Sequence, residues 1–256
     1  MKTLSITFAI CFFYAMYACA QPARFVTSGS IVYEKSVNIY GLIKQHMGKK
    51  ASPTDLIALE RYKEGHPQFR KYTATLVFNN GESLYTPQAQ PHEKILMDFN
   101  PMDDAGNIVY NNLTTRTGVT QKNIYDEIFL VKDKLRDIKW RYTGETREIA
   151  GYTCRRANAV IMDSVYVVAF YSDKIHVGGG PESFTGLPGM ILGIALPYEN
   201  VTWFATKVTD TTVPTNSIAA PKDGKAINNL ELVEFLKQKM KTWGPTGLHE
   251  RKVFAL

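Results

Sequence analysis

The sequence is poor in cysteine, with 3 among its 256 residues. Cys11 and Cys19 lie in an N-terminal apolar segment that we expect to be removed, so that Cys154 would be the one cysteine of the mature chain. A single cysteine excludes an internal disulfide framework of the kind that stabilises many secreted domains. We expect Cys154 to be a buried structural thiol, because unpaired cysteine is among the most buried residue types.

Beyond that N-terminal segment, the sequence also lacks a run of about 18 apolar residues, the length that a membrane-spanning helix needs. Its net charge of +6 is spread along the chain, and no basic stripe of the nucleic-acid-binding type is present. The hydrophobic fraction of 45% and the charged fraction of 21% suit a globular domain. We therefore expect no nucleic-acid partner and no transmembrane span in the mature chain.

The N-terminus has the pattern of an export signal. Lys2 supplies a positive end, residues 6–17 are apolar, and Ala18-Cys19-Ala20 forms a small-residue cleavage site. We predict a signal peptide over residues 1–20 and localisation in the periplasm, at the outer membrane or outside the cell. An alternative is lipid modification of Cys19, which would anchor the protein to a membrane.

Short strand patterns dominate the rest of the chain. Residues 72–78 alternate between apolar and polar positions, and Asn80-Gly81 is a strong hairpin turn signal. Many short strands with close turn signals are typical of a mainly β fold, here a curved antiparallel sheet, a half-open barrel or a sandwich. The predicted strands span residues 30–39, 72–78, 83–85, 94–99, 107–114, 117–121, 125–132, 138–142, 151–162, 165–171, 190–196 and 201–208.

Two helices complete the expected architecture. Ser52 followed by Pro53 predicts a short helix over residues 53–63, inside an excursion between two strands. Residues 230–243 predict a C-terminal helix whose apolar face packs on the sheet. We read residues 21–256 as a single β-rich domain and residues 210–228 as a loop. The apolar face of the long helix consists of Leu232, Val233, Leu236, Met240 and Trp243.

The most informative stretch is Gly186-Leu187-Pro188-Gly189-Met190-Ile191. Pro188 sets φ for the second position of a turn and Gly189 allows a positive φ at the third, which predicts a type II turn over residues 187–190. The apolar run that follows, residues 190–196, is long enough for one strand buried on both faces. A rigid turn at its start would fix the register of a central strand.

The same stretch resembles the GLPGLI signature, with Met190 in place of leucine. Trp140 and the block Gly151-Tyr152-Thr153-Cys154 resemble further elements of that family. The protein is thus similar to the GLPGLI family, exported proteins of Gram-negative bacteria whose function is uncharacterised. The resemblance assigns a structural role to Trp140, Gly151, Tyr152, Cys154, Gly186, Leu187, Pro188, Gly189, Met190 and Ile191.

A weaker, fold-level similarity links the chain to LolA-like envelope proteins. Those proteins are half-closed antiparallel barrels that shelter a lipid or lipopeptide against helices. Since fold does not fix function, this similarity implies a ligand class only by analogy.

No residue pattern identifies a catalytic centre. Arg155 and Arg156 follow Cys154 and can lower a thiol pKa, but alternation along a strand directs Arg155 away from it. The histidines lack a metal-ligand spacing, so we expect no metal and no cofactor. Ser172 and Ser183 lack the hydrolase context G-x-S-x-G.

Two loops have residues that can bind ions. Asp103-Asp104 before Gly106-Asn107 lacks the spacing of a calcium loop and is read as an acid-rich turn. Residues 178–181, Gly-Gly-Gly-Pro, can cradle an anion through backbone amides, but no helix signal follows. We interpret them as a flexible loop before the motif.

These observations favour a non-enzymatic envelope protein. We expect it to bind an apolar ligand, a lipid or lipopeptide, or an outer-membrane protein partner, with a role accessory to TonB-dependent transport. The sequence assigns no ligand-binding residues. Two alternatives stay open: an enzyme that uses Cys154, such as a hydrolase or thiol factor, and a structural component of a cell-surface assembly.

Overall fold

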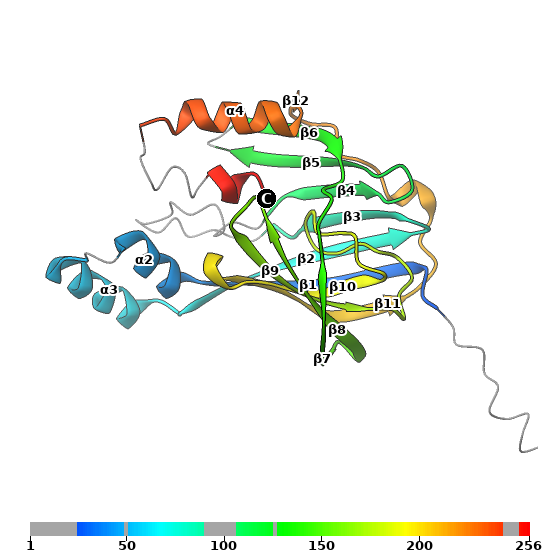
Figure 1. The fold of residues 1–256 in the computed structure, drawn as a ribbon, viewed down its shortest axis with the longest axis horizontal. Coiled ribbons are helices and arrows are strands. Elements are labelled where there is room, and N and C mark those ends of the chain that lie inside the picture. Colours follow the sequence, from blue (N-terminus) through cyan, green and yellow to red (C-terminus); the bar gives the residue numbers. More distant parts are fainter. Residues whose placement is uncertain (1–24, 49–50, 90–105, 125–126, 243–250) are drawn as a thin grey trace, which may run out of the picture.

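One large sheet forms the body of the protein. The computed structural model describes residues 25–48, 51–89, 106–124, 127–242 and 251–256. Twelve strands form one open sheet in the order β12-β6-β5-β4-β3-β2-β1-β11-β10-β9-β8-β7. The sheet coils strongly without closing into a barrel, and α4 lies across its β5–β6 end (Figure 1). The mainly β class and the curved sheet with a C-terminal helix are confirmed.

The strands pair antiparallel with one exception, since β12 runs parallel to β6. From the N-terminus the strands are β1 (Ser28–Asn38), β2 (Phe69–Asn79), β3 (Glu82–Pro87), β4 (Ile108–Asn112), β5 (Thr117–Ile124), β6 (Glu127–Lys134), β7 (Arg141–Ile149), β8 (Tyr152–Ile161), β9 (Val165–Ser172), β10 (Met190–Leu196), β11 (Val201–Asp210) and β12 (Lys225–Ile227). The helices are α2 (Ile39–Met47), α3 (Pro53–Gly65) and α4 (Asn229–Lys239), with short 3-10 helices η1 (Pro197–Glu199) and η2 (Thr215–Ser217). A further helical turn lies within residues 251–256.

Most predicted strands are present, and their turns follow local chemistry. Asn80-Gly81 connects β2 to β3 with φ of 44° and 88°, the two positive values that such a tight hairpin requires. The strand predicted over 138–142 begins only at Arg141. The strand predicted over 94–99 lies outside the described residues. The loop predicted over 210–228 contains η2 and β12, which are too short to give a periodic signal.

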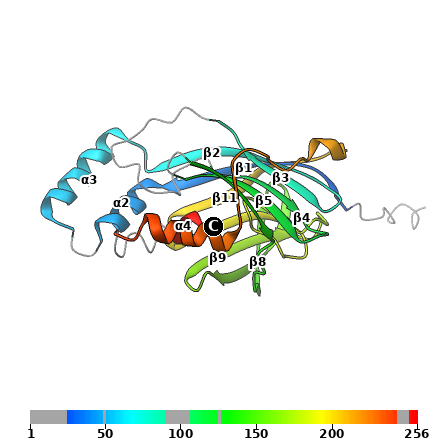
Figure 2. The ribbon, with the colours of Figure 1, turned by 90° about the horizontal axis from the view of Figure 1, so that it is seen from above.

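The helices follow their capping residues. Ser52 and Asp55 form a reciprocal capping box at the start of α3, as predicted. The sequence analysis missed α2, because its first residue, Ile39, continues the apolar alternation of β1. α2 and α3 lie together beyond the ends of strands β1 and β2, which they connect (Figure 2). No helix in the described part of the chain has the length and apolar character to cross a membrane.

The C-terminal helix packs on the sheet as predicted, but it ends at Lys239, and Val233 of the predicted apolar face is 37% exposed. Asn228 and Glu231 form its capping box. Its buried residues, Leu232, Leu236 and Met240, share a core cluster with Phe129 and Val131 of β6. Trp243, the last residue of the predicted helix, lies outside the described residues. The apolar stripe therefore covers one end of the sheet.

The motif at residues 186–191 begins a buried central strand, but its turn differs from the prediction. Gly189 has φ of 158°, close to extended backbone, whereas a type II turn needs about +80° at this position. The Met190 backbone N–H donates to the Ile175 carbonyl at 3.1 Å, so it does not close a turn onto Leu187. Six of the seven residues of β10 are buried, as expected for a strand covered on both faces.

The long β9–β10 connection folds back onto the motif that ends it. The Ile191 N–H donates to the Gly179 carbonyl at 2.8 Å, and the Gly186 N–H donates to the Gly178 carbonyl at 3.2 Å. The buried Tyr33 hydroxyl of β1 donates to the Ile191 carbonyl at 2.6 Å. These bonds satisfy the buried backbone of a loop that would otherwise lose hydrogen bonds to water.

Gly189→Ala is expected to lower the free energy of unfolding by about 1–3 kcal/mol, the range for overpacking a dense core. A Cβ at this position would lie 2.2 Å from the Ser172 carbonyl oxygen, which belongs to the backbone of β9. Urea denaturation measures the loss. Gly65→Ala is the matched control, since a Cβ there meets no atom within 4 Å and should leave stability nearly unchanged. Equal stability of the two variants would contradict the close packing of Gly189 against the Ser172 carbonyl.

Candidate functional site

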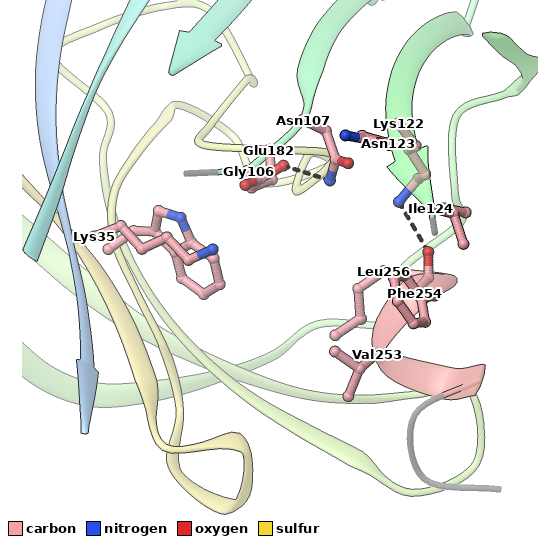
Figure 3. A pocket seen from close by; sticks show the side chains of 11 residues that line it. Lys35, Gly106, Asn107, Lys122, Asn123, Ile124, Glu182, Val253, Phe254 and Leu256 are labelled. Carbon is pink, nitrogen blue, oxygen red and sulfur yellow. Dashed lines mark hydrogen bonds between the residues drawn. The ribbon is translucent and has the colours of Figure 1, made fainter. Parts of the chain in front are cut away.

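A cavity of about 60 Å³ lies inside the sheet, between β1, β5, the β9–β10 connection and residues 251–256 (Figure 3). Its polar wall includes Lys35, Asn107, Lys122 and Glu182. Its apolar wall includes Ile124, Trp203, Val253, Phe254 and Leu256. This space holds a few water molecules or one small polar group, and it is far smaller than the roughly 300–1,000 Å³ of typical small-molecule sites.

Three ionisable side chains are buried at this place: Lys35, Lys122 and Glu182 are 3%, 6% and 6% exposed. Such residues are almost never fully buried unless charge partners compensate them. They come from β1, from β5 and from the β9–β10 connection, so the coiling of the sheet brings them together. The cluster therefore depends on the fold as a whole.

Lys35 points into the concave side of β1, where alternation otherwise places apolar residues. Its ammonium lies 5.4 Å from the centroid of the Trp203 ring and 5.9 Å from that of Tyr72. Both rings belong to the strands next to β1, and their faces attract a cation. The aromatic pair thus helps to hold a charge away from bulk water.

Lys122 is the most perturbed cation of the site. Its Nζ donates to the Phe254 carbonyl at 3.1 Å. Burial lowers the pKa of Lys122 to about 8, with Glu182 acting in the opposite direction and with Arg136 and Lys35 lowering it further. The ammonium is therefore mostly charged at pH 7, and it titrates just above neutrality.

Glu182 faces the two lysines from the β9–β10 connection. The Asn107 Nδ2 donates to its carboxylate at 3.1 Å. Gly106 permits this approach, because a Cβ on Gly106 would lie 2.4 Å from Glu182 Oε1. Burial raises the pKa of Glu182, while Lys35 and Lys122 partly offset that effect. The carboxylate and the lysines thus stabilise one another's charged forms.

Two further polar atoms beside the cluster make no hydrogen bond of ordinary geometry with the described residues: Trp203 Nε1 and Tyr85 Oη. Both side chains are at least 98% buried, and the Trp203 ring lines the cavity. Burial raises the pKa of Tyr85, as does the charge of Glu182, whereas the nearby Trp203 N–H lowers it. An indole nitrogen can only donate, and its effect on the Tyr85 pKa indicates that it faces the Tyr85 hydroxyl.

Residues 251–256 close the apolar side of the cavity, where Val253 is 4% exposed. Side chains from elsewhere bind three successive carbonyls of this segment: Lys122 donates to Phe254 at 3.1 Å, Arg136 to Ala255 at 2.8 Å and Ser183 to Leu256 at 2.8 Å. Its backbone-to-backbone bonds within the described residues are internal, Ala255 to Arg251 and Leu256 to Val253. The segment is thus attached to the sheet through side chains.

The motif residues lie outside the cavity and carry structural contacts. Trp140 Nε1 donates to the Thr185 carbonyl at 3.0 Å, directly beside Gly186. Gly151 has φ of 82° in the turn between β7 and β8, and the half-buried Tyr152 begins β8. Leu187, Met190 and Ile191 are buried, while Pro188 is exposed.

Cys154 is fully buried, with 0% exposure, and its Sγ donates to the Tyr152 carbonyl at 3.4 Å. Burial raises the pKa of its thiol to about 12, with Glu148 adding to the effect. Arg155 pairs with Asp173 and Arg156 with Glu145. Both guanidinium groups are held by these carboxylates, and neither lowers the pKa of the thiol.

The remaining candidate residues from the sequence make structural contacts where they are described. Ser172 donates to the Thr153 carbonyl at 3.1 Å, and His176 stacks on Phe25 with ring centroids 3.8 Å apart. The Gly178 and Gly179 carbonyls bind the motif, as described above. Asp103 and Asp104 lie outside the described residues. Within the part of the chain that the structure describes, no group of three His, Cys, Asp or Glu side chains is arranged to hold a metal.

Sequence reasoning missed Lys35, Lys122 and Glu182. For the lysines a signal was present, because each stands at an inward position of its strand, two residues from a buried apolar side chain: Tyr33 and Val37 flank Lys35, and Ile124 follows Lys122. Glu182 has no comparable signal, because its loop has no periodicity.

A family model described as a protein of unknown function (Porph_ging) matches residues 158–193, which include the Gly186–Ile191 motif. No curated protein matches the chain. A structure of PNGF-II in a C2 crystal form is similar at 15% identity and a TM-score of 0.50, over 79% of this chain and 31% of that one. A P21 form gives 16% identity and a TM-score of 0.48, over 85% and 34%. The chain spans about a third of those structures, and identity this low shows the fold alone.

Lys122→Met is expected to lower the free energy of unfolding at pH 7 by about 3–5 kcal/mol, because it leaves the buried Glu182 carboxylate with one cation fewer and the Phe254 carbonyl without this donor. The wild-type ammonium is itself destabilised by burial: its folded-state pKa of about 8 lies below the usual 10.5, so this effect is present below pH 8 and is relieved as the pH rises toward 10.5. The difference between wild type and variant should therefore grow between pH 7 and pH 10. Urea denaturation at pH 7 and pH 10 measures both values. The exposed Lys132→Met serves as control. A variant as stable as wild type at pH 7 would contradict the expectation.

Cys154 is expected to resist thiol reagents in the native protein and to react once urea unfolds it. Burial blocks access, and a pKa of about 12 leaves almost no thiolate at pH 8. The release of a coloured thiol from an aromatic disulfide reagent measures the rate. Thr86→Cys, on an exposed position of β3, gives the rate of an accessible thiol. Rapid native labelling of Cys154 itself would favour a thiol enzyme.

Proposed function

We propose that this protein is an exported, non-enzymatic binding protein of the cell envelope, a member of the GLPGLI family, and that its ligand binds in the cavity through an anionic group. The signal-like residues 1–20 and the motif at residues 186–191 support export and family. We also propose the periplasm or the outer membrane as its location, with a transporter of that membrane as the partner to which the ligand passes.

One observation carries the ligand proposal: two buried ammonium groups, those of Lys35 and Lys122, border the cavity together with the carboxylate of Glu182. Lys122 can donate three hydrogen bonds and gives one to Phe254 within the described residues. Among the described residues that line the cavity, Glu182 supplies the one acidic side chain. An occupant that supplies acceptor oxygens and negative charge would satisfy this wall.

The size of the cavity limits the group that enters it. About 60 Å³ accepts a carboxylate or a phosphate but no alkyl chain. A lipid or lipopeptide can therefore place only its anionic end between Lys35 and Lys122 in this conformation. The burial of Cys154 gives no support to a thiol enzyme, and no second function is proposed.

Acetate is the simplest probe of the site. We expect it to bind saturably at pH 7, as measured by NMR titration of the purified full chain, and to be lost in Lys122→Met. Affinity should fall above pH 8 by up to about tenfold per pH unit, because the Lys122 ammonium deprotonates. The pKa depends on Glu182, Arg136 and Lys35, which all face this group.

Lys122→Arg separates charge from shape. Arginine stays charged to pH values above 12, so the variant should bind acetate with a flat profile between pH 7 and 10. Lys132→Met, on the outer surface, should behave as wild type. Absence of saturable acetate binding, or equal binding by Lys122→Met, would refute the proposed function.

A further inference from the structure

We propose that the physiological ligand is an amphipathic anion, an alkyl chain ending in a carboxylate or phosphate, and that its chain takes the place now filled by Val253, Phe254 and Leu256. Residues 251–256 then act as an internal substitute for the ligand and leave when it binds. This inference rests on the proposed function and adds the apolar part of the ligand.

The first argument is adjacency. Val253, Phe254 and Leu256 border the same cavity as Lys122 and Glu182, and Phe254 lies directly beside Lys122 (Figure 3). Val253 is buried in the main core of the concave sheet. An anion placed between the lysines would therefore have its remaining atoms directed at these three side chains.

The second argument is chemical mimicry. The segment presents successive carbonyl oxygens to Lys122, Arg136 and Ser183, and it presents apolar side chains to the sheet. An amphipathic anion offers the same two features, because its head group carries oxygen acceptors and its alkyl chain is apolar. A carboxylate forms shorter and stronger bonds with the same cations than a neutral carbonyl does, so the exchange favours the ligand.

The third argument concerns attachment. Within the described residues, no backbone hydrogen bond joins residues 251–256 to a strand of the sheet. The segment can therefore leave without breaking the ladder between any two strands. Once it leaves, an alkyl chain would cover the apolar surface that its side chains cover now. A permanently docked segment around a water-filled cavity is the competing reading.

A chain-length series tests the proposal. The affinity of straight-chain carboxylates from acetate to octanoate, measured by calorimetry on the full chain, should rise about fourfold per added methylene, the increment for transfer of a CH₂ group out of water. Alkyl phosphates of the same lengths show which head group is preferred. Hydrogen exchange at residues 251–256 should quicken when octanoate binds and stay unchanged with acetate.

A reversible crosslink supplies the control. Ser183→Cys with Leu256→Cys places two cysteines in neighbouring residues, since the Ser183 hydroxyl lies 2.8 Å from the Leu256 main-chain oxygen. Oxidation of this pair to a disulfide should abolish the gain in affinity with chain length. Reduction of the same sample should restore the gain.

The outcomes separate the two proposals. Acetate binding without any dependence on chain length in the wild type overturns this inference and leaves the small-anion site. Equal octanoate binding by the oxidised and reduced crosslinked protein also overturns it, because the segment would not need to move. Loss of acetate binding itself, with octanoate still bound, would overturn the proposed function and show a purely apolar site.

Discussion

A single open sheet must cover its own concave face, and the rest of this structure follows from that constraint. Among the residues that the structure describes, no second sheet packs on it, and α4 covers its β5–β6 end. Side chains of the β9–β10 connection and of residues 251–256 pack into the core on the concave face. Irregular chain in such a place has to satisfy its backbone polar groups. This explains why its main-chain oxygens accept hydrogen bonds from the side chains of Trp140, Lys122, Arg136 and Ser183. The motif at residues 186–191 is the point where the β9–β10 connection ends and strand β10 begins.

The secondary structure could be predicted from the sequence to a large extent, because it is determined locally. Asn80-Gly81, Ser52-Pro53 and the run 190–196 each dictate their own conformation. The motif turn could not be predicted, because its geometry is set by the distant Ile175 carbonyl and by the Ser172 carbonyl, which excludes a side chain at Gly189. Short elements such as β12 are formed by pairing with a distant strand and leave no pattern of their own.

The candidate site was predicted least well. Its members stand 60 to almost 150 positions apart in the chain, and only the coiling of the sheet joins Lys35, Lys122 and Glu182. Each inward lysine is a local violation of the apolar alternation, and such violations concentrate at functional sites. The motif that is most recognisable in the sequence is structural, whereas the charged residues of the cavity belong to no recognisable motif. Burial of these charges lowers the stability of the fold, and such a loss is common where residues are retained for binding.

The two ends of the sheet differ in how they meet solvent. At one end β12 adds a short parallel strand to β6. At the other end β7 is paired on one side only, its register with β8 is irregular between Tyr142 and Thr146, and its exposed residues include Arg141, Glu145, Arg147 and Glu148. Charges and irregular pairing of this kind prevent a free edge from templating another chain. The consequence is that copies of this protein can be crowded together without zipping edge to edge into fibrils.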